Sequence, residues 1–84
     1  GHTPKMKRGR ITMGDVAAFN RQLADLIGSG IPLVKALGLL LRQIPNEKLQ
    51  GIIAQTLDDV QTGSTFADAL ARHPEVFSKL YVAM

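Results

Sequence analysis

The chain has no cysteine and no tryptophan among its 84 residues, and its aromatic residues are three Phe and one Tyr. Without cysteine, neither a disulfide framework nor a thiolate metal site can form, which excludes the small disulfide-rich proteins. No apolar run reaches the ~18 residues of a membrane-spanning helix. No signal-peptide core follows the basic start. Strictly alternating strand patterns are also missing, so we predict an all-α chain.

The positive charge lies in the first residues. The net charge is +3, yet from Ile11 onward six bases face seven acids. Four bases fall within six residues: Lys5, Lys7, Arg8 and Arg10. A nucleic-acid-binding domain usually carries its charge on a face of the fold, whereas a short charged run is typical of a solvated linker. We therefore predict a tag remnant and a basic flexible tail over residues 1–11. We predict a helical domain over residues 12–84, truncated at its C-terminus, with no nucleic-acid partner.

Apolar residues recur at intervals of three and four, which predicts helices. The predicted ranges are 13–28, 32 to 44 at the latest, 47–62 and 66–73. Thr12, Asn46 and Thr65 are the predicted N-caps, and Ser78 is expected to cap a fifth helix that the chain does not complete. The first four helices pair naturally into two hairpins.

Residues 19–37 form the corner around which we expect the chain to fold. Gly28 and Gly30 can supply the positive φ that ends a helix, and Pro32 suits the first turn of the next one. Leu39 falls outside the apolar stripe of the second helix and is a candidate partner contact.

No arrangement of residues supports catalysis. His73 is predicted to sit at a helix C-terminus, where its polar side chain suits exposed carbonyl groups. Ser64, Asp68 and His73 do not form a credible triad, because the first two are explained as helix-terminus residues. Asp58 and Asp59 diverge by about 100° on a helix and predict a solvated face. We therefore predict no enzymatic activity, no cofactor and no metal. A helix-turn-helix DNA reader is disfavoured, because neither candidate recognition helix starts with base-reading side chains.

Four blocks in order closely resemble the type II secretion F domain. They are Phe19-x-Arg21-Gln22-Leu23, Gly30-Ile-Pro32-Leu33-x-x-Ala36-Leu37, Gly63-Ser-Thr-Phe66-Ala-Asp-Ala69-Leu70 and His73-Pro74-x-x-Phe77-x-x-Leu80-Tyr81. The resemblance covers about residues 12–84 and slightly favours the type IV pilus branch over the secretion branch. It implies an antiparallel bundle of about six helices, of which this chain supplies four and the start of a fifth.

The resemblance also implies roles for individual residues. Core positions are Phe19, Leu23, Leu33, Leu37, Phe66, Leu70 and Phe77, and corner positions are Gly30, Pro32, Gly63 and Pro74. Arg21 and Gln22 are the polar members of an otherwise buried motif, so they are candidates for inter-helix hydrogen bonds or for a partner contact.

The function implied by the resemblance is mechanical. The family's platform protein lies in the bacterial inner membrane, with this domain on the cytoplasmic side. Its partners would be the assembly ATPase, other inner-membrane assembly proteins, pilin or pseudopilin, and further copies of itself. Contact with the membrane would come only through parts of a longer chain. The alternative is a free-standing soluble helical module that binds nucleic acid through its basic tail.

Overall fold

The structure is a computed structural model that describes residues 9–77. This part of the chain contains four helices. They are α1 (Met13–Gly28), α2 (Leu33–Leu41), α3 (Glu47–Gln61) and α4 (Phe66–Ala71). None of the described residues belongs to a strand, which confirms the predicted all-α class. The predicted fifth helix, capped by Ser78, lies outside the described residues.

Three of the helices begin at the predicted side-chain caps. Thr12 and Asp15 form a reciprocal capping box at α1, since each accepts from the backbone N–H of the other at 2.9–3.1 Å. Asn46 Oδ1 accepts from Leu49 N at 2.9 Å at the start of α3. Thr65 Oγ1 accepts from Asp68 N at 3.1 Å at the start of α4. Each bond satisfies a backbone donor that has no partner inside the helix.

Glycines in a left-handed conformation end α1 and α3. Gly30 has φ +90° and Gly63 has φ +115°. At the first corner, Gly30 N donates to Ile27 O and Ile31 N donates to Leu26 O, which is the bond pair of a Schellman motif. Gly63 and the following residue repeat this pattern at the end of α3. Only one glycine at the first corner takes a positive φ, because Gly28 is still helical.

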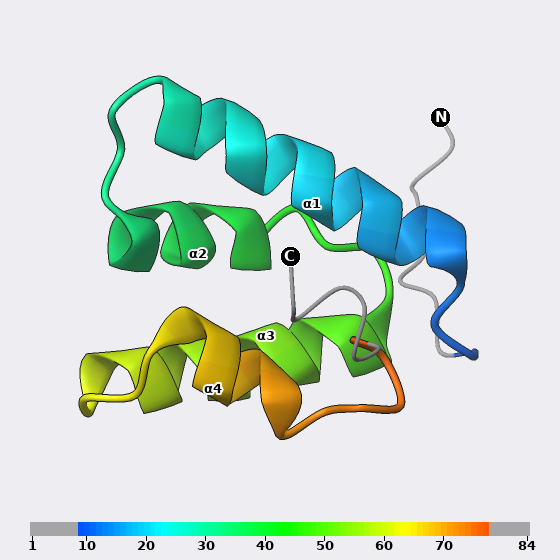
Figure 1. The fold of residues 1–84 in the computed structure, drawn as a ribbon. Helices are drawn as coiled ribbons and strands as arrows, with labels where there is room; N and C mark the ends of the chain where they lie inside the picture. The colour runs from blue at the N-terminus through cyan, green and yellow to red at the C-terminus, as the bar shows by residue number, and fades with distance from the viewer. Residues whose placement is uncertain (1–8, 78–84) are drawn as a thin grey trace.

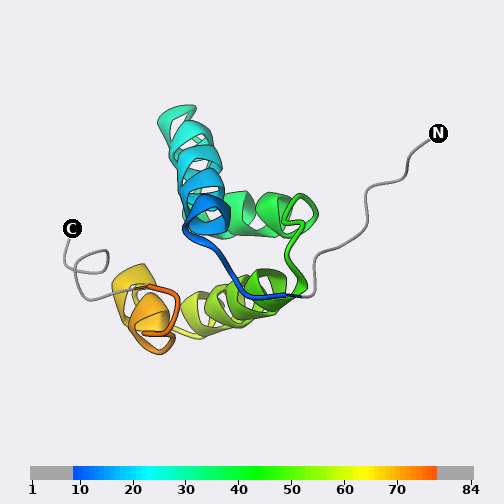
Figure 2. The same cartoon turned by 90° about the vertical axis from the view of Figure 1, so that its right-hand side faces the viewer.

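The helices form two hairpins that stack on each other. Figure 1 shows α1 running one way and α2 returning beneath it, with α3 and α4 forming the second pair below. Helix α2 lies between α1 and α3, because it packs against both of them. Figure 2, the view turned by 90°, shows that α1 crosses the second hairpin at an angle.

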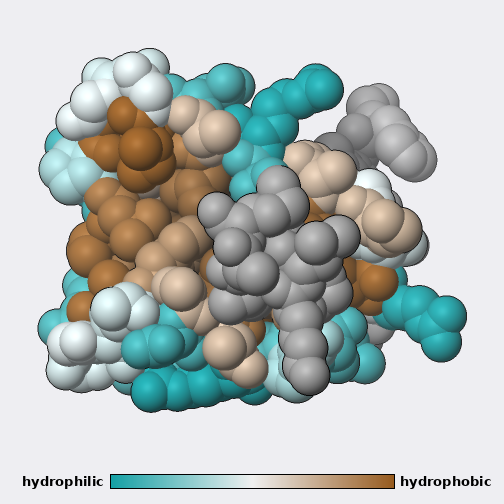
Figure 3. All heavy atoms as spheres, in the orientation of Figure 1, coloured by the Kyte–Doolittle hydropathy of each residue, from teal (hydrophilic) through white to brown (hydrophobic). Residues whose placement is uncertain are grey.

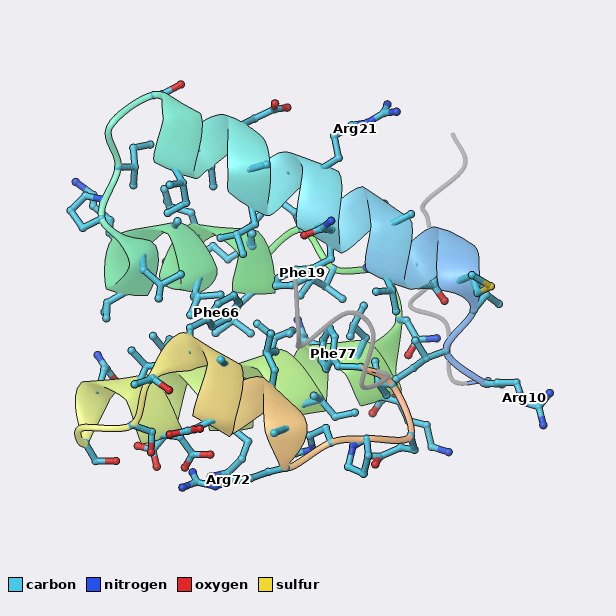
Figure 4. The ribbon with its side chains drawn as sticks, viewed as in Figure 1. Arg10, Phe19, Arg21, Phe66, Arg72 and Phe77 are labelled. Atoms are coloured by element: carbon cyan, nitrogen blue, oxygen red, sulfur yellow. The ribbon has the colours of Figure 1, made fainter. Side chains whose placement is uncertain are left out.

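The core lies between the two hairpins. Five of the seven predicted core residues are buried, namely Phe19, Leu23, Leu37, Leu70 and Phe77. Leu33 and Phe66 are half-buried and pack against this cluster. The rings of Phe19 and Phe77 have centroids 6.4 Å apart at an interplanar angle of 59°, a favourable tilted arrangement that joins α1 to the segment after α4 (Figure 4).

Some local predictions need correction. Pro32 is the N-cap of α2 with ψ 149° and is not inside the first turn. Helix α4 ends at Ala71, two residues before His73. Ile27 and Val34 have the helical spacing that predicts a buried apolar face, but they are 42% and 36% exposed. Ile27 is in the last turn of α1 and Val34 is in the first turn of α2, on either side of the corner between the two helices.

Candidate functional site: the outer face of α1

The candidate partner residues Arg21 and Gln22 lie on the exposed side of α1. Figure 4 shows Arg21 pointing away from the other three helices. Within residues 9–77 we find no hydrogen bond or ion pair from either side chain. Ala17 and Ala18 lie beside them, and the four residues together line a shallow hollow. The role in inter-helix hydrogen bonds is therefore absent from the described region, and partner contact stays a prediction.

A groove continues from this hollow, because Ala17 lines both. It has a volume of about 370 Å³ and separates the first half of α1 from the segment after α4. Its apolar lining includes Ile11, Met13, Val16 and Val76, and its polar lining includes Asn20 and Glu75. Met13 is 89% exposed. Flexible, polarizable methionine is common on surfaces that bind partners.

Sequence reasoning did not find this groove. Its lining comes from residues about 60 positions apart, which meet only when the segment after α4 packs beside α1. We call the exposed part of α1 formed by Met13, Ala17, Ala18, Arg21 and Gln22 the α1 surface.

Leu39 is 40% exposed on α2, as the sequence predicted. It lies on a different helix from Arg21 and Gln22, so the candidate contacts do not come from one element. Figure 3 shows a second apolar area, with brown atoms gathered over α2 and toward the α3–α4 hairpin. The exposed Val34 and the half-buried Leu33 belong to α2 on its predicted apolar stripe.

Asp59 does not lie on a solvated face, contrary to the prediction for the Asp58–Asp59 pair. Its side chain is 14% exposed, and its Oδ2 lies 2.8 Å from Nη1 of Arg72. Gln55 Nε2 donates to the other carboxylate oxygen at 3.1 Å. Asp68 lies four residues before Arg72, the spacing of a helical ion pair, but Arg72 reaches across to Asp59 on α3 instead. Hydrogen bonding by Arg72 is the main cause that lowers the pKa of Asp59, so this carboxylate joins α3 to the end of α4.

Three other features of the described residues bear on a metal site, a histidine site and a membrane span. Within residues 9–77, no three His, Asp or Glu side chains are placed to hold a metal ion. His73 Nδ1 lies 3.8 Å from Glu75 Oε1, two residues further along the chain. No helix in this region has the length and apolar character to cross a bilayer.

These features define a small all-helical domain with exposed apolar and polar side chains on α1 and α2. Residues 19–84 match the family described as "Type II secretion system (T2SS), protein F", and the chain belongs to this family. The match confirms the predicted family and the predicted all-α fold class.

Relatives come from both branches of the family. The chain is 43% identical over 79 residues to the "Type IV pilus assembly protein PilC" of Thermus thermophilus, a match that covers 94% of this chain and 19% of that protein. It is 41% identical over 76 residues to the protein of the same name from Myxococcus xanthus, covering 90% of the chain and 18% of that protein. It is 42% identical over 66 residues to the "Type II secretion system protein F" of Xanthomonas campestris pv. campestris, a match that covers 79% of this chain and 16% of that protein. The chain thus spans about a fifth of the length of these relatives.

Proposed function

We propose that this chain is a non-enzymatic scaffold domain of an inner-membrane platform protein and lies on the cytoplasmic side of the membrane. In this role it couples the assembly ATPase to the assembly of pilin or pseudopilin subunits. The observation that carries the proposal is the family match over residues 19–84, together with relatives named for pilus assembly and for type II secretion. The lack of any catalytic constellation in the sequence agrees with a scaffold.

The physical features of the described region support a mechanical role. The Asp59–Arg72 ion pair and the Phe19–Phe77 contact both connect separate parts of the fold. Close packing and ion pairs between elements let a domain move as one body and transmit a displacement. Identities of 43% and 42% to relatives from the two branches are too close to separate a pilus from a secretion machine.

The location is tested by fractionating cells that express the full-length protein containing this chain, followed by a high-salt wash. We expect the protein to stay in the membrane fraction, because a platform protein is anchored by apolar spans that salt does not release. Recovery in the soluble fraction, or release by salt, would contradict the platform assignment. It would favour the alternative of a soluble module that acts through its basic tail.

We further propose that the α1 surface is a partner contact. The double substitution Arg21→Ala with Gln22→Ala removes two exposed polar side chains that make no described contact within the domain. We expect it to reduce co-purification of the assembly ATPase with the full-length protein and to leave the unfolding temperature unchanged. Lys35→Ala is the matched control, because it removes an exposed cation from α2. Equal ATPase recovery from the double variant and the control would refute this contact.

A further inference from the structure

Asn46 is the one fully buried amide side chain among the described residues, with an exposed fraction of 0%. Its Oδ1 accepts the Leu49 backbone N–H at 2.9 Å, as expected of an N-cap. A backbone N–H can only donate, so this bond fixes which side-chain atom is oxygen and which is nitrogen. The NH₂ group must therefore find its acceptors on the other side, away from α3.

Three acceptors surround that NH₂ group. Asn46 Nδ2 lies 3.2 Å from Gly9 O, 3.4 Å from Arg10 O and 3.5 Å from Asp15 Oδ2. Two amide hydrogens are shared among these oxygens, so each contact is individually long. Together they satisfy a buried polar group that would otherwise be costly.

The same cluster contains the start of α1. Asp15 is 9% exposed, and the oxygen that faces Asn46 also accepts the Thr12 backbone N–H at 2.9 Å. Ile11, which lies in the chain between Arg10 and Thr12, packs against the hydrophobic core. A single side chain thereby contacts the segment before α1, the capping box of α1 and the first turn of α3, which belong to both hairpins.

We propose that Asn46 is a latch that fastens residues 9–12 to both helical hairpins, so that a displacement of this segment is transmitted to α1 and α3 together. We call residues 9–12 the strap. Strap residues line a hollow together with Lys48 and Ile52 of α3 and with Val76 after α4, so release of the strap would change the surface beside both elements. This inference rests on the contacts of Asn46 and is independent of the proposed membrane function.

Trypsin gives a direct readout of the latch, because it cleaves after Arg10, whose carbonyl group Asn46 holds. We expect the Arg10–Ile11 bond of the intact chain to be cut at least about tenfold more slowly than the same bond in a synthetic peptide of residues 5–16. Asn46→Ser keeps an N-cap oxygen for α3 but lacks the amide donor. We expect this variant to be cut about tenfold faster than the intact chain, as the loss of one or two hydrogen bonds would give.

Thr65→Ala is the matched control, because it removes the N-cap of α4 without a described contact to the strap. We expect its Arg10–Ile11 bond to be cut at the rate of the intact chain. Equal acceleration in Thr65→Ala and Asn46→Ser would mean general destabilisation and would overturn the latch. Full protection in Asn46→Ser, or no protection of the intact chain relative to the peptide, would overturn it as well.

A double-mutant cycle tests the coupling itself and does not depend on protease access. Deleting residues 1–10 removes both strap carbonyls that face Asn46. If the latch exists, the deletion lowers the unfolding temperature of the intact chain and has little further effect in the Asn46→Ser background. Additive effects of the deletion and the substitution would show that Asn46 and the strap act independently, and would refute the proposal.

Discussion

Replacing Gly30 with alanine isolates the contribution of one backbone conformation at the α1–α2 corner. The residue has φ +90°, and a Cβ added there would have no heavy atom within 4 Å. Steric contact with neighbours therefore contributes nothing, and the penalty comes from the left-handed backbone alone, about 1–2 kcal/mol. For a domain of this size, unfolding temperature changes by roughly 4–8 °C per kcal/mol. We therefore expect a decrease of about 4 to 16 °C, and a larger decrease for Gly30→Val because its side chain is β-branched.

Gly28→Ala is the control for this experiment, since it lies two residues earlier and is also free of heavy atoms within 4 Å of an added Cβ. Its backbone is helical, so alanine should stabilise the protein by up to about 1 kcal/mol. Gly63→Ala should repeat the Gly30→Ala result, because Gly63 ends α3 with φ +115° and equally open surroundings. The unfolding temperature of each of the three variants is measured by thermal unfolding monitored with circular dichroism. An unchanged or raised unfolding temperature for Gly30→Ala would refute the reasoning.

Three other predictions concern the core, the ion pair and the α1 surface. Phe77→Ala should cost about 3–5 kcal/mol in urea unfolding, because the ring is 1% exposed and packs on Phe19; a loss under about 1 kcal/mol would contradict its place in the core. Arg72 lowers the pKa of Asp59, so the ionised carboxylate stabilises the folded protein. This stabilisation is complete above the usual carboxyl pKa of about 4, and it is lost as the pH falls through the lowered pKa of Asp59 in the folded protein. Asp59→Asn should flatten that acid decline in unfolding temperature, and identical pH curves would argue against the linkage. Arg21→Ala should change the free energy of unfolding by less than about 0.5 kcal/mol, as measured by urea titration, because the side chain is exposed; a loss above about 1 kcal/mol would indicate a structural role.

The helix termini could be predicted from the sequence because their interactions are local. The hydrogen bonds that cap α1, α3 and α4 join residues three positions apart. Gly30 and Gly63 follow the same logic, since a Schellman motif spans six consecutive residues. The four sequence blocks in order predicted the family, and the match over residues 19–84 confirmed that family.

Burial of individual side chains was less predictable. Thr56 is a polar residue of α3 that the sequence did not place in the core, yet it is fully buried. Its Oγ1 donates to Ile52 O at 2.9 Å, which satisfies the hydroxyl group inside the core. Ile27 and Val34 have the right helical spacing but stay exposed. Helical periodicity predicts which residues share a face, whereas burial depends on how far the next helix extends over that face.

The sequence by itself determined the helices, their caps and the glycine corners, because neighbouring residues supply all the atoms involved. Only the tertiary structure decided that Arg72 pairs with Asp59 and that the groove beside α1 exists. It also decided that the amide of Asn46, predicted only as a cap, reaches carbonyl groups 36 and 37 residues earlier in the chain. No local pattern encodes such contacts, because they require two hairpins to pack at one particular angle before the donor and its acceptors come within hydrogen-bonding distance.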